Sequence, residues 1–194
     1  MWKNIKTPYI FYILLKIKYK KGGDRVSKYI AYPFLYDDTN DLRCDFEILT
    51  DEISSMIGFL RSFIEDESLK LELSKINELV YHTNPSLRTM TTVTKDELLW
   101  LEERTLIIKE SVSHRYNKFV LPEGCTSASL SHVIRVKCKS LVRLLSRYQQ
   151  QGNKVDQILF DFCNLFSGYF FYLALKLNDN ANIEEMEYIS RNYK

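Results

Sequence analysis

The sequence contains few residues that interrupt helices, with only six glycines and four prolines among 194 residues. Because these are the strongest helix breakers, and because leucine, isoleucine, lysine and glutamate are abundant, the composition favours long helices. A strong bias of charge is also absent, since 27 basic and 25 acidic side chains leave a formal net charge of +2. The composition therefore gives no general case for nucleic-acid binding, and any anion-binding site must be local.

Clustered metal ligands and paired cysteines are missing as well. The four cysteines are far apart in the sequence and include no Cys-x-x-Cys pair: Cys44, Cys125, Cys138 and Cys163. This spacing argues against a metal site or a disulfide framework and fits a reducing cytoplasm best. The histidines are also scattered, and we interpret His82 and His114 as surface or helix-end residues.

The apolar run at residues 8–15 is far shorter than the roughly 20 residues that span a bilayer. Lysines follow it at once and no small-residue cleavage site appears, so we expect neither a membrane span nor a signal peptide. The chain suits a single domain, residues 1–194. We divide it into an N-terminal arm and loop (1–40), a helical bundle (41–178) and a polar tail (179–194) with room for one loose helix.

Apolar periodicity predicts five helices in this bundle. Their expected ranges are 46–64, 67–82, 95–113, 127–148 and 155–177. Thr94 and Glu97 have the spacing of a capping box that opens the third helix. Aromatic residues surround much of the fifth helix, which predicts burial on more than one side and indicates a subunit interface. The expected fold class is all-α, a five-helix bundle with a glycine-containing N-terminal arm.

The segment 118–143, KFVLPEGCTSASLSHVIRVKCKSLVR, is the most informative part of the sequence. A Pro-Glu-Gly turn precedes small and hydroxyl residues of the kind found at helix N-termini. In the helix that follows, Arg135, Lys139 and Arg143 recur at steps of four and therefore form one stripe. A cationic stripe belongs either to a plainly amphipathic helix or to the wall of an anionic ligand site.

This segment resembles the signature F-I-L-P-G-G … L-H-x-x-R-x-x-x-R-R-x-E-R of the PduO-type ATP:corrinoid adenosyltransferases. Residues 41–58 resemble that family's L-R-V-E-A-Y-G-x-V-D-E-L-N-S-x-I-G, and residues 162–171 resemble Y-L-N-R-L-S-D-x-L-F. The three blocks keep the family's order. The resemblance implies transfer of the 5'-deoxyadenosyl group from ATP to a cob(I)alamin-type corrinoid, with Mg²⁺ accompanying ATP. It also implies a homotrimer with active sites between subunits.

The resemblance assigns catalytic roles to three residues. Asp51 and Arg135 match two charges that form a salt bridge across a subunit boundary beside the active site. Phe119 matches a phenylalanine that lies over the corrin and displaces its lower axial ligand. From the residues alone, Asp51 and Arg135 are ordinary helix-surface charges, and Phe119 is a core phenylalanine before a turn.

Further residues match the family's ATP-binding positions. The resemblance implies that the N-terminal arm surrounds the triphosphate. Glycine lets backbone amides approach phosphate, and lysine neutralises its charge. The matching residues of the arm are Lys20, Lys21, Gly23 and Asp24. Lys139 and Arg143 would hold the triphosphate, and Asn164 is retained from the third block. Without the resemblance, the arm segment is more simply a basic turn.

Five positions depart from the family's pattern: Val26, Ser140, Val142, Leu165 and Gly168. They replace glycine, arginine, glutamate, arginine and aspartate, and so remove donors aimed at phosphate or their partners.

Two hypotheses follow. The protein is an adenosyltransferase, which needs positioning and charge stabilisation and little acid–base chemistry. Alternatively, it is a diverged, non-catalytic relative that binds a nucleotide, a corrinoid or a protein partner. An unrelated helical interaction protein is a third possibility.

Overall fold

The computed structural model describes residues 38–116 and 118–192, and every structural statement below concerns these residues. They form five α-helices and one short 3₁₀ helix. The helices are α2 (Leu42–Arg61), α3 (Glu67–Thr83), η2 (Asn84–Leu87), α4 (Lys95–Ser111), α5 (Thr126–Gln150) and α6 (Gln157–Asn180). The predicted all-α, five-helix bundle is confirmed. The N-terminal arm expected at residues 1–40 lies almost entirely outside the described residues.

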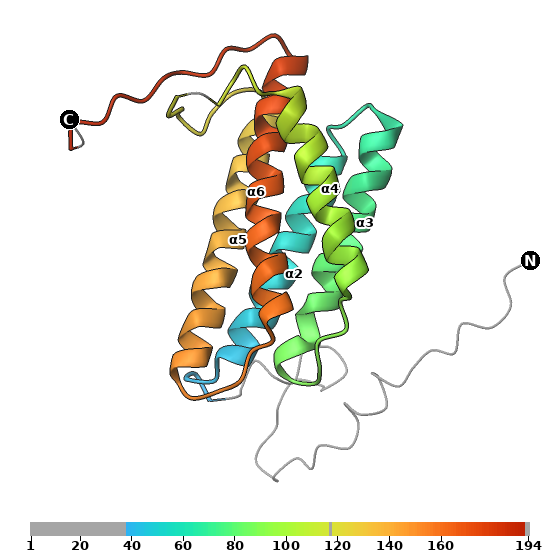
Figure 1. Cartoon of the computed structure of the whole chain (residues 1–194), viewed down its shortest axis with the longest axis vertical. Helices are drawn as coiled ribbons and strands as arrows, with labels where there is room; N and C mark the ends of the chain where they lie inside the picture. The colour runs from blue at the N-terminus through green and yellow to red at the C-terminus, as the bar shows by residue number, and fades with distance from the viewer. Residues whose placement is uncertain (1–37, 117, 193–194) are drawn as a thin grey trace, which may run out of the picture. The chain divides into compact units, whose positions relative to one another are not determined.

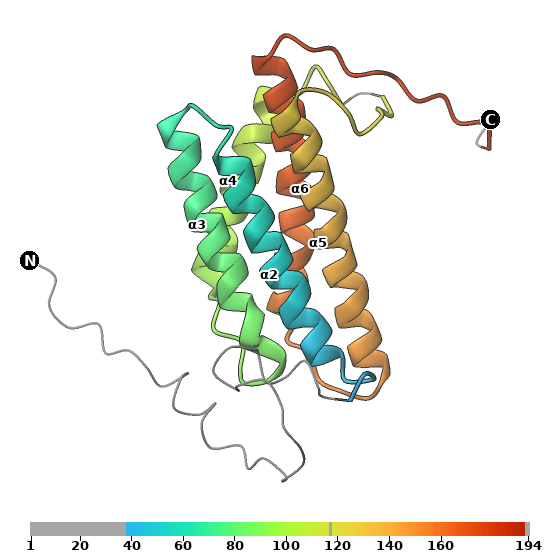
Figure 2. The same cartoon turned by 180° about the vertical axis from the view of Figure 1, so that it is seen from behind.

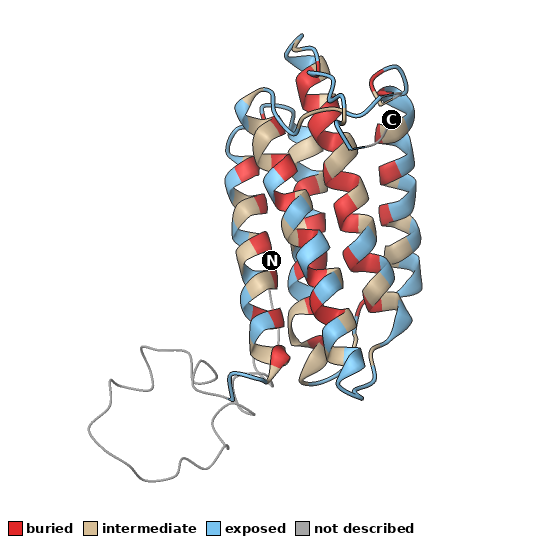
Figure 3. Ribbon diagram, turned by 90° about the vertical axis from the view of Figure 1, so that its left-hand side faces the viewer, coloured by how far each residue is buried: buried red, intermediate tan, exposed pale blue. Residues whose placement is uncertain are grey.

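Helix α6 contributes the largest set of buried residues among the helices described. It packs most extensively against α5 and α4, while α2 packs against α5 and α3 (Figures 1 and 2). Buried residues face the interior on each helix (Figure 3). The aromatic side chains Phe162, Phe166, Tyr169 and Phe170 are fully buried within this one chain. The bundle itself therefore accounts for the aromatic character of α6, which does not by itself require a partner subunit.

By length and composition alone, α6 is also apolar enough to cross a membrane. However, 56% of its most apolar window is buried inside the bundle. A helix that buries much of its circumference against its neighbours has this composition without a membrane.

Side-chain caps fix where the helices begin. The predicted capping box is confirmed, because the Thr94 hydroxyl accepts from the Glu97 amide while the Glu97 carboxylate accepts from the Thr94 amide. Helix α2 begins four residues before the predicted start, because Asp41 accepts from the Arg43 amide at 3.0 Å. The prediction missed this cap because Asp41 precedes the apolar periodicity that was used to place the helix.

A buried polar cluster sets the register of three helices. The Glu72 carboxylate of α3 accepts from the Arg104 guanidinium of α4 at 2.6–2.7 Å and from the Tyr169 hydroxyl of α6 at 2.7 Å. Burial, followed by the adjacent charge of Glu72, raises the pKa of Tyr169 well above its usual value. All three groups thus have partners where the helices meet, as buried polar groups require.

Up to residue 192, where the described chain ends, the C-terminal tail does not contain the loose helix allowed for by the sequence. Helix α6 extends to Asn180, and the following residues run without helical structure beside the loop between α4 and α5 (Figure 1). Val120 and Glu187 form an isolated antiparallel bridge there. Backbone pairing with a distant loop therefore replaces the local hydrogen bonds of a helix, an outcome that residues 179–194 alone do not indicate.

Candidate functional site

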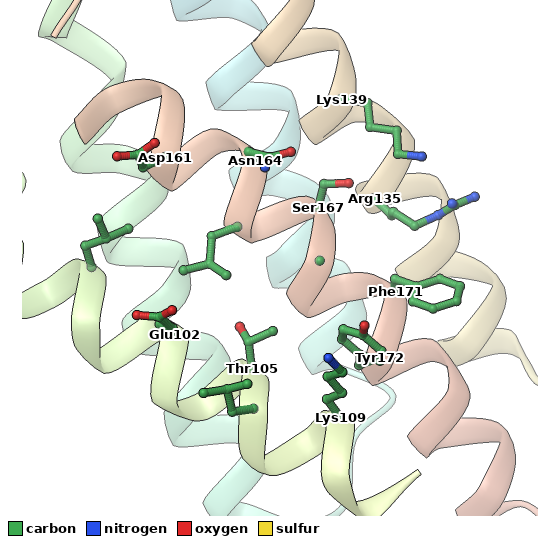
Figure 4. A pocket seen from close by; sticks show the side chains of 14 residues that line it. Glu102, Thr105, Lys109, Arg135, Lys139, Asp161, Asn164, Ser167, Phe171 and Tyr172 are labelled. Carbon is green, nitrogen blue, oxygen red and sulfur yellow. The ribbon is translucent and has the colours of Figure 1, made fainter. Parts of the chain in front are cut away.

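An open groove of about 780 Å³ lies between α4, α5 and α6. Figure 4 shows side chains from all three helices around it, with Lys109 from α4, Arg135 and Lys139 from α5, and Asn164 and Ser167 from α6. Glu102 and Asp161 lie toward the opposite side of the groove from Arg135 and Lys139 (Figure 4). The groove therefore has a cationic wall and an acidic wall, and three predicted site residues (Arg135, Lys139 and Asn164) meet in it.

Arg135 is the half-buried cation of this groove. Burial lowers the pKa of its guanidinium below the usual value, although arginine stays charged under ordinary conditions. Its Nε is buried and has no hydrogen-bond partner among the described residues. The guanidinium carbon lies 5.8 Å from the centre of the Phe171 ring. A partly exposed guanidinium beside an open groove is well suited to binding an anion.

His132 lies one turn before Arg135 and was not assigned a role from the sequence. It is 3% exposed, and neither ring nitrogen has a hydrogen-bond partner among the described residues. Its ring centre is 6.4 Å from that of Phe171. Burial and then the charge of Arg135 lower the pKa of His132 to about 4, so the imidazole is neutral at neutral pH. No sequence signal beyond its position in the L-H motif distinguishes it.

A second hollow, of about 450 Å³, adjoins the groove through Lys139. Arg143 and Arg147 also line it, together with Ser140. The cations at steps of four therefore form the stripe that the sequence predicts, and this stripe runs from the groove into the hollow. Lys139 and Arg143 are exposed, so they are available to an anionic ligand.

Other predicted site residues lie away from the groove. Asp51 is exposed on α2, and within the described part of the chain it forms no ion pair. Its predicted partner, Arg135, was expected from another subunit, so this geometry leaves that pairing a prediction. Phe119 is 82% exposed in the loop between α4 and α5, and is not the core phenylalanine considered from the sequence. Lys20, Lys21, Gly23, Asp24 and the departure at Val26 fall outside the described residues.

The remaining four departures from the family's pattern occupy ordinary structural environments. The Ser140 hydroxyl donates to the Val136 carbonyl at 3.2 Å. Val142 and Leu165 pack against the hydrophobic core. A Cβ placed at Gly168 would meet nothing within 4 Å, so this glycine leaves open space on the groove wall. Where the family's pattern has an arginine and an aspartate, this chain therefore has an apolar contact at Leu165 and open space at Gly168.

All four cysteines are free thiols. Burial raises the pKa of Cys163 to about 12 and that of Cys138 well above its usual value. Within residues 38–116 and 118–192, no group of three or more histidine, cysteine, aspartate or glutamate side chains is placed to hold a metal ion. The groove itself is lined by cations, carboxylates, hydroxyl groups, an amide and aromatic rings.

Residues 38–177 match the cobalamin adenosyltransferase family, and the chain belongs to this family. It is 25% identical over 160 residues to the corrinoid adenosyltransferase of Bacillus subtilis (strain 168), a match that covers 78% of this chain and 82% of the relative. The resemblance inferred from the three sequence blocks is confirmed.

Solved structures of a PduO-type ATP:corrinoid adenosyltransferase from Lactobacillus reuteri have the same fold. One of these structures is a variant with alanine in place of a phenylalanine, and it is complexed with cobalamin and ATP. It superposes on this chain with a TM-score of 0.69 at 25% identity, and the match covers 78% of this chain and 88% of that one. A variant with lysine in place of an arginine, complexed with ATP, gives 0.67 at 26% identity, covering 77% and 88%.

Proposed function

We propose that this protein transfers the 5'-deoxyadenosyl group from ATP to a cob(I)alamin-type corrinoid. The reduced cobalt of the substrate supplies the electron pair that forms a bond to C5' of ATP, and the C5'–O bond breaks as triphosphate leaves. The observation that carries this proposal is the placement of Arg135 and Lys139 together in an open groove of a cobalamin adenosyltransferase fold.

The groove residues fit the requirements of this reaction. No proton has to be moved at the reacting carbon, so fixed charge and alignment of the two substrates supply the catalysis. Arg135 and Lys139 would stabilise the negative charge that builds on the leaving triphosphate. Arg135 is the better oriented of the two, because the Phe171 ring covers its guanidinium. Asn164 would contribute an amide to the same ligand.

Lys139 keeps the basic character of its position, where the family's signature has an arginine, and this exchange is compatible with ATP binding. In the Lactobacillus reuteri enzyme the two substituted residues, a phenylalanine and an arginine, are 20 positions apart. Phe119 and Lys139 have the same separation. The reuteri variant that carries lysine in place of the arginine is complexed with ATP. By this correspondence, the lysine found naturally in our chain is compatible with nucleotide binding.

The proposal extends to the assembly. We infer a homotrimer in the cytoplasm, with Mg²⁺ accompanying ATP, Asp51 pairing with Arg135 of a neighbouring subunit and Phe119 lying against the corrin. The exposed carboxylate of Asp51, the partly exposed side chain of Arg135 and the exposed ring of Phe119 support this arrangement. Sedimentation velocity tests it: a trimer that Asp51→Ala weakens is expected, and a monomer at all concentrations would contradict it.

Calorimetric titration with Mg-ATP tests the groove assignment. Arg135→Ala should weaken ATP binding by about tenfold or more, because hydrogen bonds to charged groups contribute about 1.5–3 kcal/mol. Arg147→Ala is the comparison, since Arg147 is an exposed arginine three turns further along α5, at the far end of the second hollow from the groove that Arg135 lines. Equal and negligible effects of the two substitutions would contradict the assignment.

The diverged binding protein remains the second candidate. The departures at Ser140, Val142, Leu165 and Gly168 favour it, because each removes a charge that the family's pattern contains. It differs from the enzyme in one observable respect, since it would bind ATP or corrinoid without forming adenosylcorrinoid.

A further inference from the structure

The loop that carries Phe119 is paired with the C-terminal segment of the chain. We call residues 118–125 the Phe119 loop and residues 183–190 the C-terminal segment. The Tyr188 amide donates to the Phe119 carbonyl at 2.8 Å, and the Leu121 amide donates to the Met186 carbonyl at 2.9 Å. These bonds surround the antiparallel bridge between Val120 and Glu187. Figure 1 shows the segment leaving α6 and running beside the loop.

Arg115 fixes the beginning of the C-terminal segment. Its side chain is 8% exposed and donates to Asp179 at 2.9 Å, to the Ile183 carbonyl at 2.8 Å and to Glu185 at 2.8 Å. The Glu185 side chain is only 3% exposed. A guanidinium can hold three acceptors in a fixed geometry because its donors form a planar fork. Arg115 therefore joins the end of α4 to the end of α6 and to the segment beyond it.

Asn178 fixes the far end of the Phe119 loop. Its Oδ1 accepts from the Cys125 amide at 3.0 Å, and its Nδ2 donates to the Glu123 carbonyl at 3.0 Å. Nδ2 also lies 3.3 Å from Oε1 of Glu185. Gly124 between them has a φ of +142°, and a Cβ at this position would lie 1.9 Å from Oδ1 of Asn178. Only glycine allows the loop to approach Asn178 so closely.

Glu185 connects the two ends of this arrangement. One of its oxygens accepts from Arg115 and the other from Asn178, so a single buried carboxylate ties the C-terminal segment to the root of the Phe119 loop. Such a network is expensive to leave incomplete, because each buried polar group needs a partner. A buried, charged network therefore fixes the conformation of a loop that is otherwise exposed.

This order does not bury the Phe119 ring among the described residues. The backbone around Phe119 is paired with the C-terminal segment, yet the residue is 82% exposed. An ordered loop that presents an uncovered aromatic ring is well suited to contact a large apolar ligand surface. In the proposed function, that surface is the face of the corrin ring.

We propose that Arg115, Asn178 and Glu185 are positioning residues, which hold the C-terminal segment against the Phe119 loop and thereby place Phe119 for the corrinoid. The identity of the ligand as a corrinoid rests on the proposed function. The network acts through Phe119 and touches neither Arg135 nor Lys139 by any hydrogen bond found among the described residues. Disturbing it should therefore affect corrinoid binding much more than ATP binding.

Glu185→Ala tests the proposal, with Glu187→Ala as the matched control. Glu187 lies two residues along the same segment, but its side chain is 53% exposed and only approaches Lys118 at 3.7 Å. Glu185→Ala should accelerate hydrogen exchange at the Leu121 and Tyr188 amides about tenfold or more. Each amide is bonded across the pairing of loop and segment, which the substitution releases. It should also weaken cob(II)alamin binding about tenfold or more, as misplaced ligand contacts do. ATP binding should change less than about twofold, and Glu187→Ala should leave all three measurements near those of the unaltered protein.

Gly124→Ala provides an independent disturbance from the loop side, since its Cβ collides with Asn178 while the C-terminal segment is unchanged. It should reproduce the loss of cob(II)alamin binding with ATP binding retained. Unaltered corrinoid binding in both variants, or equal losses for both substrates, would overturn the positioning role. If the unaltered protein failed to bind any corrinoid, the proposed function would be overturned together with this use of the network. Slow exchange at Leu121 and Tyr188 in Glu185→Ala would overturn the proposal whatever the ligand.

Discussion

The guanidinium of Arg135 lies over the ring of Phe171, with 5.8 Å between the guanidinium carbon and the ring centre. The pair joins α5 to α6 at the wall of the groove and leaves the buried Nε of Arg135 without a partner among the described residues. The aromatic face restrains the cation without neutralising it. A positive charge that is fixed at the groove wall stabilises the binding of a triphosphate.

Phe171→Ala should therefore weaken ATP binding without removing any charge. Loss of a partly buried cation–π contact corresponds to about 1 kcal/mol, or roughly a fivefold rise in Kd. Calorimetric titration with Mg-ATP measures it. Phe59→Ala is a control, because Phe59 is an exposed phenylalanine of α2 whose ring meets that of Phe63 edge-on, outside the groove. An unchanged Kd for Phe171→Ala would show that the ring does not orient Arg135 for the nucleotide.

Substitutions of Lys139 should change nucleotide affinity in both directions. Lys139→Arg adds a planar fork of donors that matches phosphate oxygens, so we expect ATP binding to tighten by a few fold. Lys139→Ala removes the charge and should weaken binding by about tenfold, in line with hydrogen bonds to charged groups. In ATP titrations of the three proteins, we expect the affinity to be highest with arginine at position 139, intermediate with lysine and lowest with alanine. Indistinguishable affinities would remove Lys139 from the site.

His132 should make the protein less stable as the pH falls from about 6.5 toward 4. Its pKa in the folded protein is about 4, against the ordinary 6.5, because of burial and then the charge of Arg135. In this window the unfolded chain binds a proton that the folded protein excludes. The free energy of unfolding therefore falls on acidification, by at most about 1.4 kcal/mol per pH unit, and above pH 6.5 the residue contributes no slope.

Urea denaturation at several pH values between 7 and 4.5 measures this effect. His132→Gln cannot titrate in the window, so its stability should fall less steeply on acidification than that of the unaltered protein, whatever its stability at pH 7. Parallel pH profiles for the two proteins would mean that the pKa of His132 is not lowered by folding.

The hydroxyl of Tyr169 should contribute to stability through Glu72. Tyr169→Phe removes the donor at 2.7 Å but leaves the ring, and should lower the free energy of unfolding by about 1–2 kcal/mol, because the buried carboxylate loses a partner. Tyr81→Phe is the control, since Tyr81 is 57% exposed. The comparison is made by urea denaturation, and equal stabilities of the two variants would contradict a structural role for the Glu72 cluster.

Local patterns in the sequence predicted much of this structure. Thr94 and Glu97 act within one helical turn, so their spacing alone located the start of α4. The stripe of Arg135, Lys139 and Arg143 follows in the same way from helical geometry. Both features depend on residues three or four positions apart, where the helix itself dictates which side chains are neighbours.

Features that depend on distant pairing could not be predicted in this way. Arg115 meets Glu185 across 70 positions, and Cys125 meets Asn178 across 53. Nothing local marks these residues as partners, because each is an ordinary helix-end or tail residue until the bundle brings them together. The burial of His132 was missed for a related reason, since its neighbour Phe171 lies on another helix.

The most direct test of the proposed function is an anaerobic assay of the purified protein with ATP, Mg²⁺ and chemically reduced cob(I)alamin. The disappearance of the Co(I) absorbance and the appearance of adenosylcobalamin are followed together. Transferase activity predicts adenosylcobalamin above the protein-free control, and a lower rate with Arg135→Ala. Retained ATP binding with no product above the control would contradict the enzyme and establish the diverged binding protein in its place.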